Sequence, residues 1–563
     1  MDTGHRLDRE SFPTIGKFGA IFPTIGKKVS NHWKIFWRAG LAAAALGAGG
    51  LALADEGEWV PWPLPWESDE GIFFSRVEDI DGSERVRAAG PFYEHSSATN
   101  GTELFAPVRP FWSRAVDPVG GRTNWDACWP VADGKTFGNE VSWRVGLAWY
   151  LDKDRTDAAT KAERFWILPV WASGKTAEGK PYSALFPLGG TVHDFLWRDR
   201  ISFAFWPVWM ETEVNGLHST NVLWPVYMRA SSENGKWDKL RVFPFYSRST
   251  NKRQFEKKSV MWPFWSQAEY THPKANGKAW VLFPVCGRVD LNSQKGWMLL
   301  PPLFQYVKGE EMTRLYCPWP LFQRETGKYR QRLYVWPFWG RRTDGELQRT
   351  FWAWPFLSRE QNRVGREKRV RWTLAPFYNR VTTSVPEGDP GPAPGNKPSL
   401  FSAIAPGSGS GDSDATPPPA DDGPRRVVAT RTKVWPLYSH ASDTETGEMR
   451  WRTLELWPGP NPAPVERSWA PLWTLADYRA KADRSELDVL WGLYRQRSEA
   501  DGSRSFSAFP LWAHNRSEPR GERHWSLLKG LVAWDRTPEQ RRLRFLWVGR
   551  WTFDTPVVES PNP

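Results

Sequence analysis

The residue types that usually perform catalysis or bind metals are few in this chain of 563 residues, and they are not grouped. The chain has nine histidines and three cysteines, and no two histidines have the H-x-x-x-H or H-E-x-x-H spacing of a metal site. No Walker, Rossmann or G-x-S-x-G motif occurs, and the carboxylates are scattered through turn-forming stretches. The sequence therefore predicts no enzyme active site, no metal site and no cofactor, and it names no ligand-binding residue.

Arginine and the aromatic residues are the side chains whose spacing is regular. An Arg repeatedly stands four residues after a recurring Pro, and His440 and His514 take the same position in two further copies. Exposed Trp rings that stack on sugars, beside Arg that grips acidic groups, would make a glycan-binding surface. The other interpretation is that aromatic residues at a fixed strand position form a core or an interface girdle. The arginines at this position are Arg114, Arg229, Arg248, Arg288, Arg324, Arg341, Arg359 and Arg380.

The elements that would position these residues come from one repeated phrase, an apolar residue, then Pro, then another apolar residue. Trp224-Pro225-Val226 and Trp262-Pro263-Phe264 are two copies, and successive prolines from Pro169 to Pro376 lie 17 to 21 residues apart. The polar stretches between copies contain Asn-Gly and Asp-Gly, which favour tight turns. Each copy is therefore predicted to be one strand of about 9 to 12 residues, centred on its proline.

Consecutive strands joined by tight turns must run antiparallel. The predicted fold class is all-β, a long antiparallel up-and-down meander of about two dozen strands, closed as a large barrel because long sheet edges need cover. A parallel solenoid is the alternative, but it would stack the arginines about 4.8 Å apart, like charge on like charge. In the meander the arginines are expected at opposite ends of successive strands, as two charged borders around an apolar belt.

Both faces of the predicted strands are apolar near the proline. In the stretch 332–342, one face would carry Leu333, Val335, Pro337, Trp339 and Arg341, and the other Tyr334, Trp336 and Phe338. A half-buried soluble sheet alternates apolar and polar residues instead, so this pattern predicts a sheet that is covered on both faces. The cover would be a second sheet, or lipid on one side and packed side chains on the other.

The chain is expected to be exported and to have six regions. Basic residues precede an apolar run from Ala39 to Ala54 that ends in Ala-Leu-Ala, which resembles a secretory signal peptide. Residues 381–430 are rich in Pro and Gly, with no Trp and no Tyr, which predicts a disordered insertion. The regions are 1–54, signal peptide; 55–164, N-terminal β region with degenerate repeats; 165–380, aromatic-Pro strand repeats; 381–430, the insertion; 431–553, C-terminal strand repeats; and 554–563, a tail.

The last predicted strand resembles the closing strand of bacterial outer-membrane β-barrel proteins. Its alternating residues are Leu543, Phe545, Trp547, Gly549, Trp551 and Phe553, and ten residues follow Phe553. The resemblance implies an exported, non-enzymatic protein of the bacterial outer membrane, periplasm or cell surface, with a structural or channel role. With a net charge of +12, the expected partner is membrane lipid or another envelope component, and export argues against nucleic acid. The alternative is a soluble exported β-repeat protein that binds a glycan or another envelope component through its Trp and Arg surfaces. The barrel interpretation depends on each proline-centred phrase being a single strand.

Overall fold

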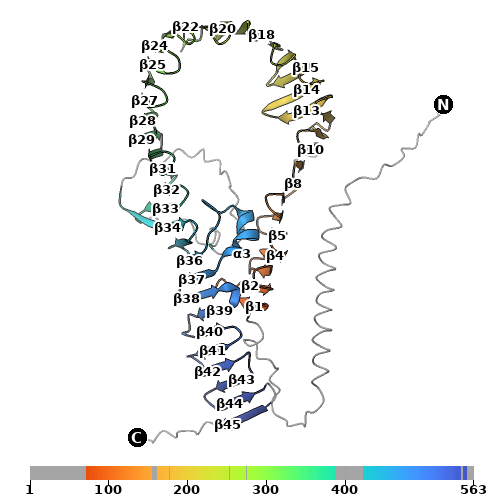
Figure 1. The fold of residues 1–563 in the computed structure, drawn as a ribbon, viewed down its shortest axis with the longest axis vertical. Helices are drawn as coiled ribbons and strands as arrows, with labels where there is room; N and C mark the ends of the chain where they lie inside the picture. Colours follow the sequence, from red (N-terminus) through yellow and green to blue (C-terminus); the bar gives the residue numbers. More distant parts are fainter. Residues whose placement is uncertain are drawn as a thin grey trace, which may run out of the picture. The chain divides into compact units, whose positions relative to one another are not determined.

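A computed structural model describes residues 71–154, 161–176, 178–252, 254–273, 276–388, 400, 423–546 and 549–554. The predicted signal peptide and most of the predicted tail therefore lie outside the described residues. The described part is one sheet of 45 strands, and each strand pairs antiparallel with the next one along the chain (Figure 1). This confirms the all-β antiparallel meander and excludes the parallel solenoid.

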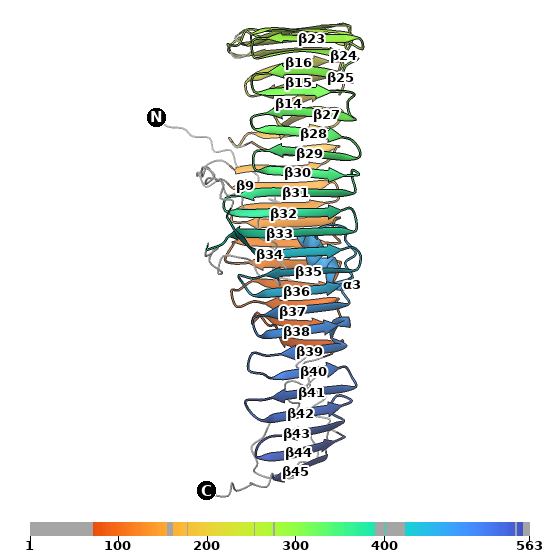
Figure 2. The ribbon, with the colours of Figure 1, turned by 90° about the vertical axis from the view of Figure 1, so that its left-hand side faces the viewer.

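The strands are short, mostly six residues, and they follow one another in ladder order (Figure 2). The first third comprises β1 (Phe74–Glu78), β2 (Glu84–Ala88), β3 (Tyr93–Ser97), β4 (Glu103–Val108), β5 (Trp112–Asp117), β6 (Arg122–Ala127), β7 (Ala132–Phe137), β8 (Glu140–Val145), β9 (Ala148–Asp154), β10 (Lys161–Ile167), β11 (Trp171–Lys175), β12 (Pro181–Leu185), β13 (Gly189–Phe195), β14 (Arg198–Ala204) and β15 (Trp209–Val214). The middle comprises β16 (Leu217–Val222), β17 (Tyr227–Ser232), β18 (Trp237–Val242), β19 (Tyr246–Asn251), β20 (Phe255–Val260), β21 (Trp265–Tyr270), β22 (Gly277–Leu282), β23 (Cys286–Leu291), β24 (Gln294–Leu299), β25 (Phe304–Gly309), β26 (Met312–Tyr316), β27 (Phe322–Gly327), β28 (Arg330–Val335), β29 (Trp339–Asp344) and β30 (Leu347–Trp352). The last third comprises β31 (Leu357–Val364), β32 (Glu367–Leu374), β33 (Tyr378–Pro386), β34 (Arg425–Val434), β35 (Tyr438–Asp443), β36 (Glu448–Thr453), β37 (Ala476–Lys481), β38 (Arg484–Val489), β39 (Tyr494–Ser498), β40 (Arg504–Ala508), β41 (Trp512–Ser517), β42 (Glu522–Leu527), β43 (Val532–Arg536), β44 (Gln540–Phe545) and β45 (Gly549–Asp554).

The predicted position of the prolines at strand centres is wrong, because the proline phrases are turns between strands. Strand β16 ends at Val222 and β17 begins at Tyr227, so Trp224 and Pro225 occupy the tip. The Val226 N–H donates to the Leu223 carbonyl at 2.8 Å, which closes a four-residue turn with Trp-Pro at its centre. Proline suits this place because it has no N–H to give to a strand ladder.

Each repeat therefore contributes two short strands instead of one long strand, which gives 45 strands where about two dozen were predicted. One turn of the repeat carries the apolar-Pro phrase, and the other carries polar residues such as Asn234-Gly235. The stretch 332–342 is accordingly a hairpin between β28 and β29, not a strand that is apolar on both faces. The predicted terminal strand of 543–553 is likewise two strands, β44 and β45, which pair with each other.

The sheet does not close into a barrel by pairing its two edge strands, since β1 pairs with β2 and β45 pairs with β44 within the described residues. Instead it curls back, so that β2 to β6 pack against β37, β38 and the segment before them (Figure 1). That segment joins β36 to β37 and contains two short helices, η3 (Val465–Trp469) and α3 (Ala470–Trp473). A further turn of helix, η4 (Leu490–Gly492), links β38 to β39.

The segment predicted to be a disordered insertion has strand at both of its ends. Residues 381–386 belong to β33 and residues 425–430 belong to β34, which pair with each other. Within this segment, residues 389–399 and 401–422 lie outside the described part of the chain. The array of paired strands therefore continues across the connection.

Most of the sheet is a single layer, and its apolar core is small. Trp166, Ala172, Tyr182, Ala184 and Val192 form one buried apolar cluster on strands β10 to β13. The largest fully buried side chain is the charged Arg109, and Glu455 and Asp126 are also almost fully buried. Burial in this molecule is thus concentrated where the curled sheet meets itself, and there it is mainly polar.

Candidate functional site

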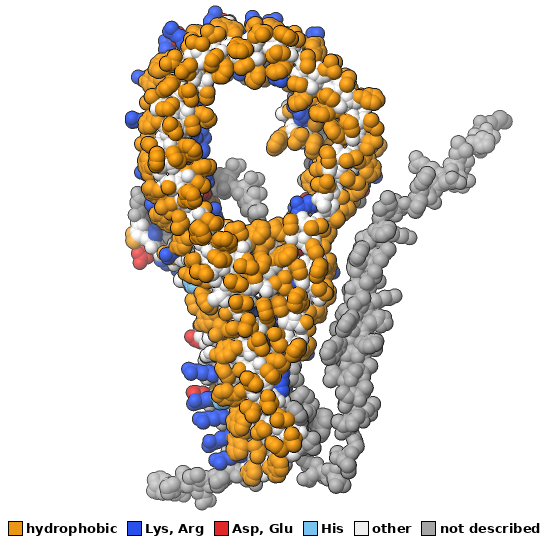
Figure 3. Space-filling view, in the orientation of Figure 1, with side chains coloured by type: hydrophobic (Ala, Val, Ile, Leu, Met, Phe, Trp, Pro, Cys, Tyr) orange, Lys and Arg blue, Asp and Glu red, His pale blue; other side chains and the backbone are white. Residues whose placement is uncertain are grey.

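The apolar-Pro turns lie along one border of the sheet, which we call the proline border. A meander places every second connection at the same end of its strands, and the apolar-Pro turns are every second connection. The side chains at their tips are exposed: Phe245 is 60% exposed, Phe338 72%, Phe356 57% and Leu437 62%. Viewed along the strands, apolar side chains cover this border (Figure 3).

The backbone of the proline border is well satisfied by hydrogen bonds. The Trp224 N–H donates to the Pro207 carbonyl of the preceding apolar turn at 2.8 Å, and the Trp354 N–H donates to Pro337 in the same way. The Pro residues themselves have no N–H to satisfy. Adjacent turns are therefore joined to one another, and the border exposes side chains more than it exposes unpaired backbone donors.

Aromatic rings form a second connection along the proline border. The ring centroids of Trp206 and Trp224 are 6.1 Å apart, and those of Trp336 and Trp354 are 5.8 Å apart. Each pair joins two successive apolar turns, at distances typical of favourable aromatic pairs. These rings form an exposed rim at one end of the strands, so they are not the buried core that was one of the two interpretations of the repeated aromatic residues.

The opposite border carries the polar turns. In the turn between β17 and β18, the Lys236 N–H donates to the Asn234 side chain, and Gly235 adopts a φ of +63° that suits glycine. Trp197, between β13 and β14, is an exception, because it is a large apolar side chain that is 93% exposed on this border. Apart from such exceptions, the proline border presents apolar side chains and the opposite border presents polar turn residues.

The arginines that follow the prolines do not alternate between the ends of the sheet, as the sequence had predicted. Each repeat holds two strands, so every strand that follows an apolar-Pro turn runs in the same direction. The arginine is the third residue of such a strand, and all these arginines therefore lie at the same distance from the proline border, in one row across the sheet. Register links Arg324 to Leu333, Leu333 to Arg341, and Arg341 to Thr350, and so on across neighbouring strands. His440 joins the same row through its partner Thr432.

Four of these arginines follow one another on alternate strands, and we call them the arginine row: Arg324, Arg341, Arg359 and Arg380. All four are exposed. None forms an ion pair with another residue of the described chain, although the Arg359 guanidinium lies over the Trp372 ring at 5.3 Å. We call the sheet face that carries the row, on strands β27 to β33, the arginine face.

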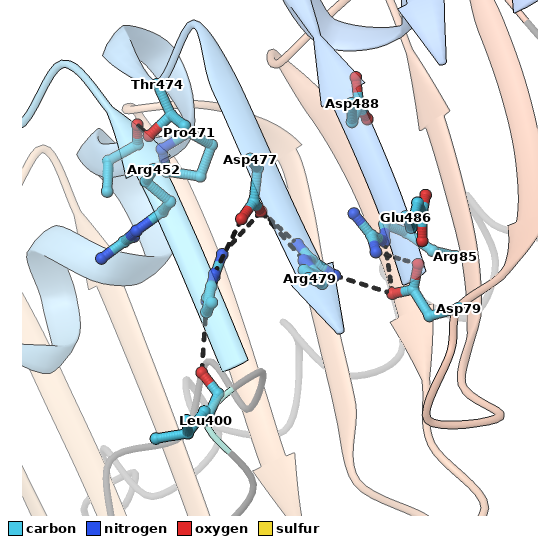
Figure 4. A network of polar contacts seen from close by, with 12 residues as sticks. Asp79, Arg85, Leu400, Arg452, Pro471, Thr474, Asp477, Arg479, Glu486 and Asp488 are labelled. Carbon is cyan, nitrogen blue, oxygen red and sulfur yellow. Dashed lines mark hydrogen bonds and ion pairs between the residues drawn. The ribbon is translucent and has the colours of Figure 1, made fainter. Parts of the chain in front are cut away.

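The second distinctive cluster is a buried set of ion pairs where the curled sheet meets itself, which we call the ionic junction. Arg87 on β2 donates to Asp488 on β38 at 2.7 Å. Arg479 on β37 lies 3.2 Å from Asp79, and it also donates to Asp477 (Figure 4). Arg109 is only 1% exposed and donates to the Arg467 carbonyl at 2.7 Å. The remaining members are Arg85, Glu94, Asp126, Arg467 and Asp477.

Electrostatics in and around the junction favour charged carboxylates. Burial would raise the pKa of Glu94, but Arg109 and Arg87 outweigh this effect and hold the pKa far below its usual range. Beside the junction, the Glu466 carboxylate accepts hydrogen bonds from Arg452 at 2.7 and 2.9 Å, and this pairing outweighs burial and lowers its pKa to about 2. At Asp126 burial prevails over Arg467, so its pKa is raised.

The junction has the composition of a structural clamp. Its carboxylates Asp79, Glu94, Asp126 and Asp477 each accept a hydrogen bond from an arginine side chain, so the ion pairs connect β1 to β6 with β37 and the segment before it. No group of three or more His, Cys, Asp or Glu residues able to hold a metal occurs within the described ranges. Nor does this part of the chain contain a helix long and apolar enough to cross a membrane.

Sequence reasoning identified the prolines, the aromatic residues and the arginines, but it missed the ionic junction. The junction joins residues such as Arg87 and Asp488 that lie 401 positions apart, and nothing in their spacing links them. A weak signal exists in the late repeats, where charged residues such as Asp477 and Arg479 alternate on one face of a strand. Comparison with known proteins adds no relative, since no protein-family model and no curated protein matches this chain.

Proposed function

We propose that this protein is an exported, non-enzymatic component of the cell envelope that attaches to a lipid membrane along its proline border. The observation that carries the proposal is the exposure of large apolar side chains at successive turns of one border. Contiguous exposed apolar surface of this extent is typical of a site that meets a membrane or a partner. Trp rings beside prolines, on a backbone that is internally hydrogen-bonded, suit the interface of a bilayer.

The short strands favour attachment of the sheet to the membrane surface over strands that span the membrane. A strand of six residues rises roughly 20 Å, whereas the hydrocarbon core is about 30 Å thick and a barrel strand needs about 9 to 11 residues. The outer-membrane barrel expected from the sequence also required the proline phrases to be strands, and they are turns. A sheet that inserts its apolar rim into one leaflet needs no longer strand, so a structural role fits the fold better than a channel role.

The proposal is tested by sedimentation of the full chain with vesicles of phosphatidylglycerol and phosphatidylethanolamine. Replacing Phe338, Phe356 and Phe377 together by Ser removes three exposed rings from the proline border. We expect the vesicle partition coefficient to fall by at least about a hundredfold, because each of the three rings that no longer enters lipid loses roughly 1 to 2 kcal/mol.

The matched control is Trp197→Ser, which removes an even more exposed ring from the opposite border. This variant is expected to bind vesicles as the parent chain does. All variants keep residues 1–70, so any affinity of that segment for lipid is the same in each. Equal losses in both variants, or a parent chain that stays in the supernatant, would contradict the proposal.

A further inference from the structure

The arginine face carries positive charge without negative charge, because the strands that form it hold their carboxylates on the opposite side of the sheet. Successive residues of a strand point to opposite faces, and paired residues on neighbouring strands share a face, so the register fixes which side each residue occupies. On strands β27 to β33 this face carries Arg324, Arg341, Arg359, Arg363, Lys368 and Arg380, and no Asp or Glu. The carboxylates of the same strands, Glu325, Asp344, Glu360 and Glu367, all lie on the other face.

The two faces also differ in how their arginines are used. On the other face, Arg332 lies 3.5 Å from Glu325 and Arg349 lies 2.7 Å from Glu360, so cations and anions neutralise each other. The four members of the arginine row have no such acidic partner in the described chain. Each guanidinium therefore keeps planar N–H donors that fit a carboxylate, sulfate or phosphate group of a ligand.

Flat rings and neutral hydrogen-bonding groups lie between and beside these arginines. Trp372 stands between Arg359 and Arg380 in the register and is 37% exposed. It stacks with Trp352 at 5.9 Å and an interplanar angle of 6°, so two indole planes are presented together. Thr350 and Gln348 add hydroxyl and amide groups on the same face. The indole rings can pack against sugar rings, the hydroxyl and amide groups can hydrogen-bond to sugar hydroxyls, and the arginines can bind anionic groups.

We infer that the arginine face binds an extended acidic polysaccharide, which lies across the strands along the arginine row. Successive members of the row are two strands apart, about 10 Å, so the face offers one cation for roughly each disaccharide of an extended chain. A nucleic acid strand carries a charge about every 3.4 Å, and the row would leave most of those charges unmatched. The sparse, regular charge of an acidic glycan is the better fit.

This inference is independent of membrane attachment. The glycan would lie on a face of the sheet, while the lipid would contact the border where the turns are. The third residue of a strand stands roughly 7 to 10 Å from that border. A chain that fails to bind vesicles can therefore still bind the glycan, and the converse also holds.

The test measures binding of the full chain to hyaluronate, which carries one carboxylate per disaccharide, by isothermal titration calorimetry, in parallel with neutral dextran and with a single-stranded thymidine oligonucleotide. We expect hyaluronate to bind and dextran to bind at least roughly tenfold more weakly. Replacing the whole arginine row by Gln should weaken hyaluronate binding at least roughly tenfold. Trp372→Ala should weaken it by a smaller factor, roughly threefold to tenfold.

The control variant is Arg349→Gln, which removes a cation of the same strands from the opposite face. It should bind hyaluronate as the parent chain does. If the fourfold variant fails to fold by circular dichroism, the single Arg341→Gln and Arg359→Gln variants replace it, each with an expected loss of roughly threefold. Absence of hyaluronate binding, an equal loss in the control, or tighter binding of the oligonucleotide would overturn the inference.

Discussion

Replacing Arg109 by Met is expected to destabilise the protein more than any other single change at the ionic junction. The Arg109 side chain donates to the carbonyls of Arg467 and Pro91 and to the Glu94 carboxylate, at 2.7 to 3.0 Å, and it is 1% exposed. Without it, two carbonyls lose their donor and the buried Glu94 loses its nearest cation. Breaking a buried pair by removing one partner typically costs about 3 to 5 kcal/mol, so we expect a loss of this size.

Hydrogen exchange is the suitable measurement for this variant, because a long array of strands need not unfold in one step. Peptides from β3 to β5 and from η3 should exchange faster in the Arg109→Met variant, while peptides from β20 to β30 should be unchanged. The control is Arg324→Met, an exposed arginine without an acidic partner in the described residues, for which a change within about 0.5 kcal/mol is expected. Unchanged protection at η3 would show that Arg109 does not hold the two parts of the sheet together.

The second large effect is expected at acid pH, where the ionic junction should open. Arginine partners outweigh burial and hold the pKa of Glu94, Asp477 and Asp488 below their ordinary values. A carboxylate whose pKa is lower in the folded protein stabilises the fold above its unfolded pKa, and this stabilisation is lost as the pH falls. For Glu466 the window runs from pH 4.5 down to about 2.

The Glu466 contribution can be estimated and tested separately. The full shift corresponds to about 3 kcal/mol, and the 28% exposure of its side chain reduces this to about 2 kcal/mol. Asp126 and Glu486 act in the opposite sense, because burial raises their pKa and their protonation favours the folded state as the pH falls. Since more carboxylates have a lowered pKa than a raised one, we expect net destabilisation by acid.

The acid effect is measured as hydrogen exchange of β2, β37 and β38 at pH values between 5 and 2. The Glu466→Gln variant is the control, since it removes one titrating group, and its stability should depend less steeply on pH below 4.5. Protection of β2 and β38 that is constant from pH 5 to 2 would mean that these ion pairs do not hold the sheet to itself.

The sequence predicted the class of fold because tight-turn residues at regular intervals leave few alternatives to an antiparallel meander. It did not predict the place of the prolines. Trp224, Val226 and Tyr227 all have high strand propensity, so the apolar residues around Pro225 resemble a strand centre, and only the missing N–H of Pro225 argued for a turn. The hydrogen bond from Val226 to Leu223 decides between the two.

The candidate surfaces were predictable to different degrees. The arginine row follows from a spacing that the sequence displays, but its side of the sheet depends on the number of strands in each repeat. With one strand per repeat, Arg324 and Arg341 would lie at opposite ends, whereas with two strands they share a row. The ionic junction could not be predicted, because contacts such as that between Asp126 and Arg467 require the curl of the whole sheet.

The regular alternation of apolar and polar turns also limits how such a chain can change length in evolution. Gain or loss of a single strand would reverse the direction of every later strand, and would move the later prolines to the polar edge of the sheet. The arginines that follow those prolines would then lie three residues from the polar edge, outside the arginine row. Only the addition or removal of complete hairpins preserves both surfaces, so viable length variants of this protein should differ by even numbers of strands.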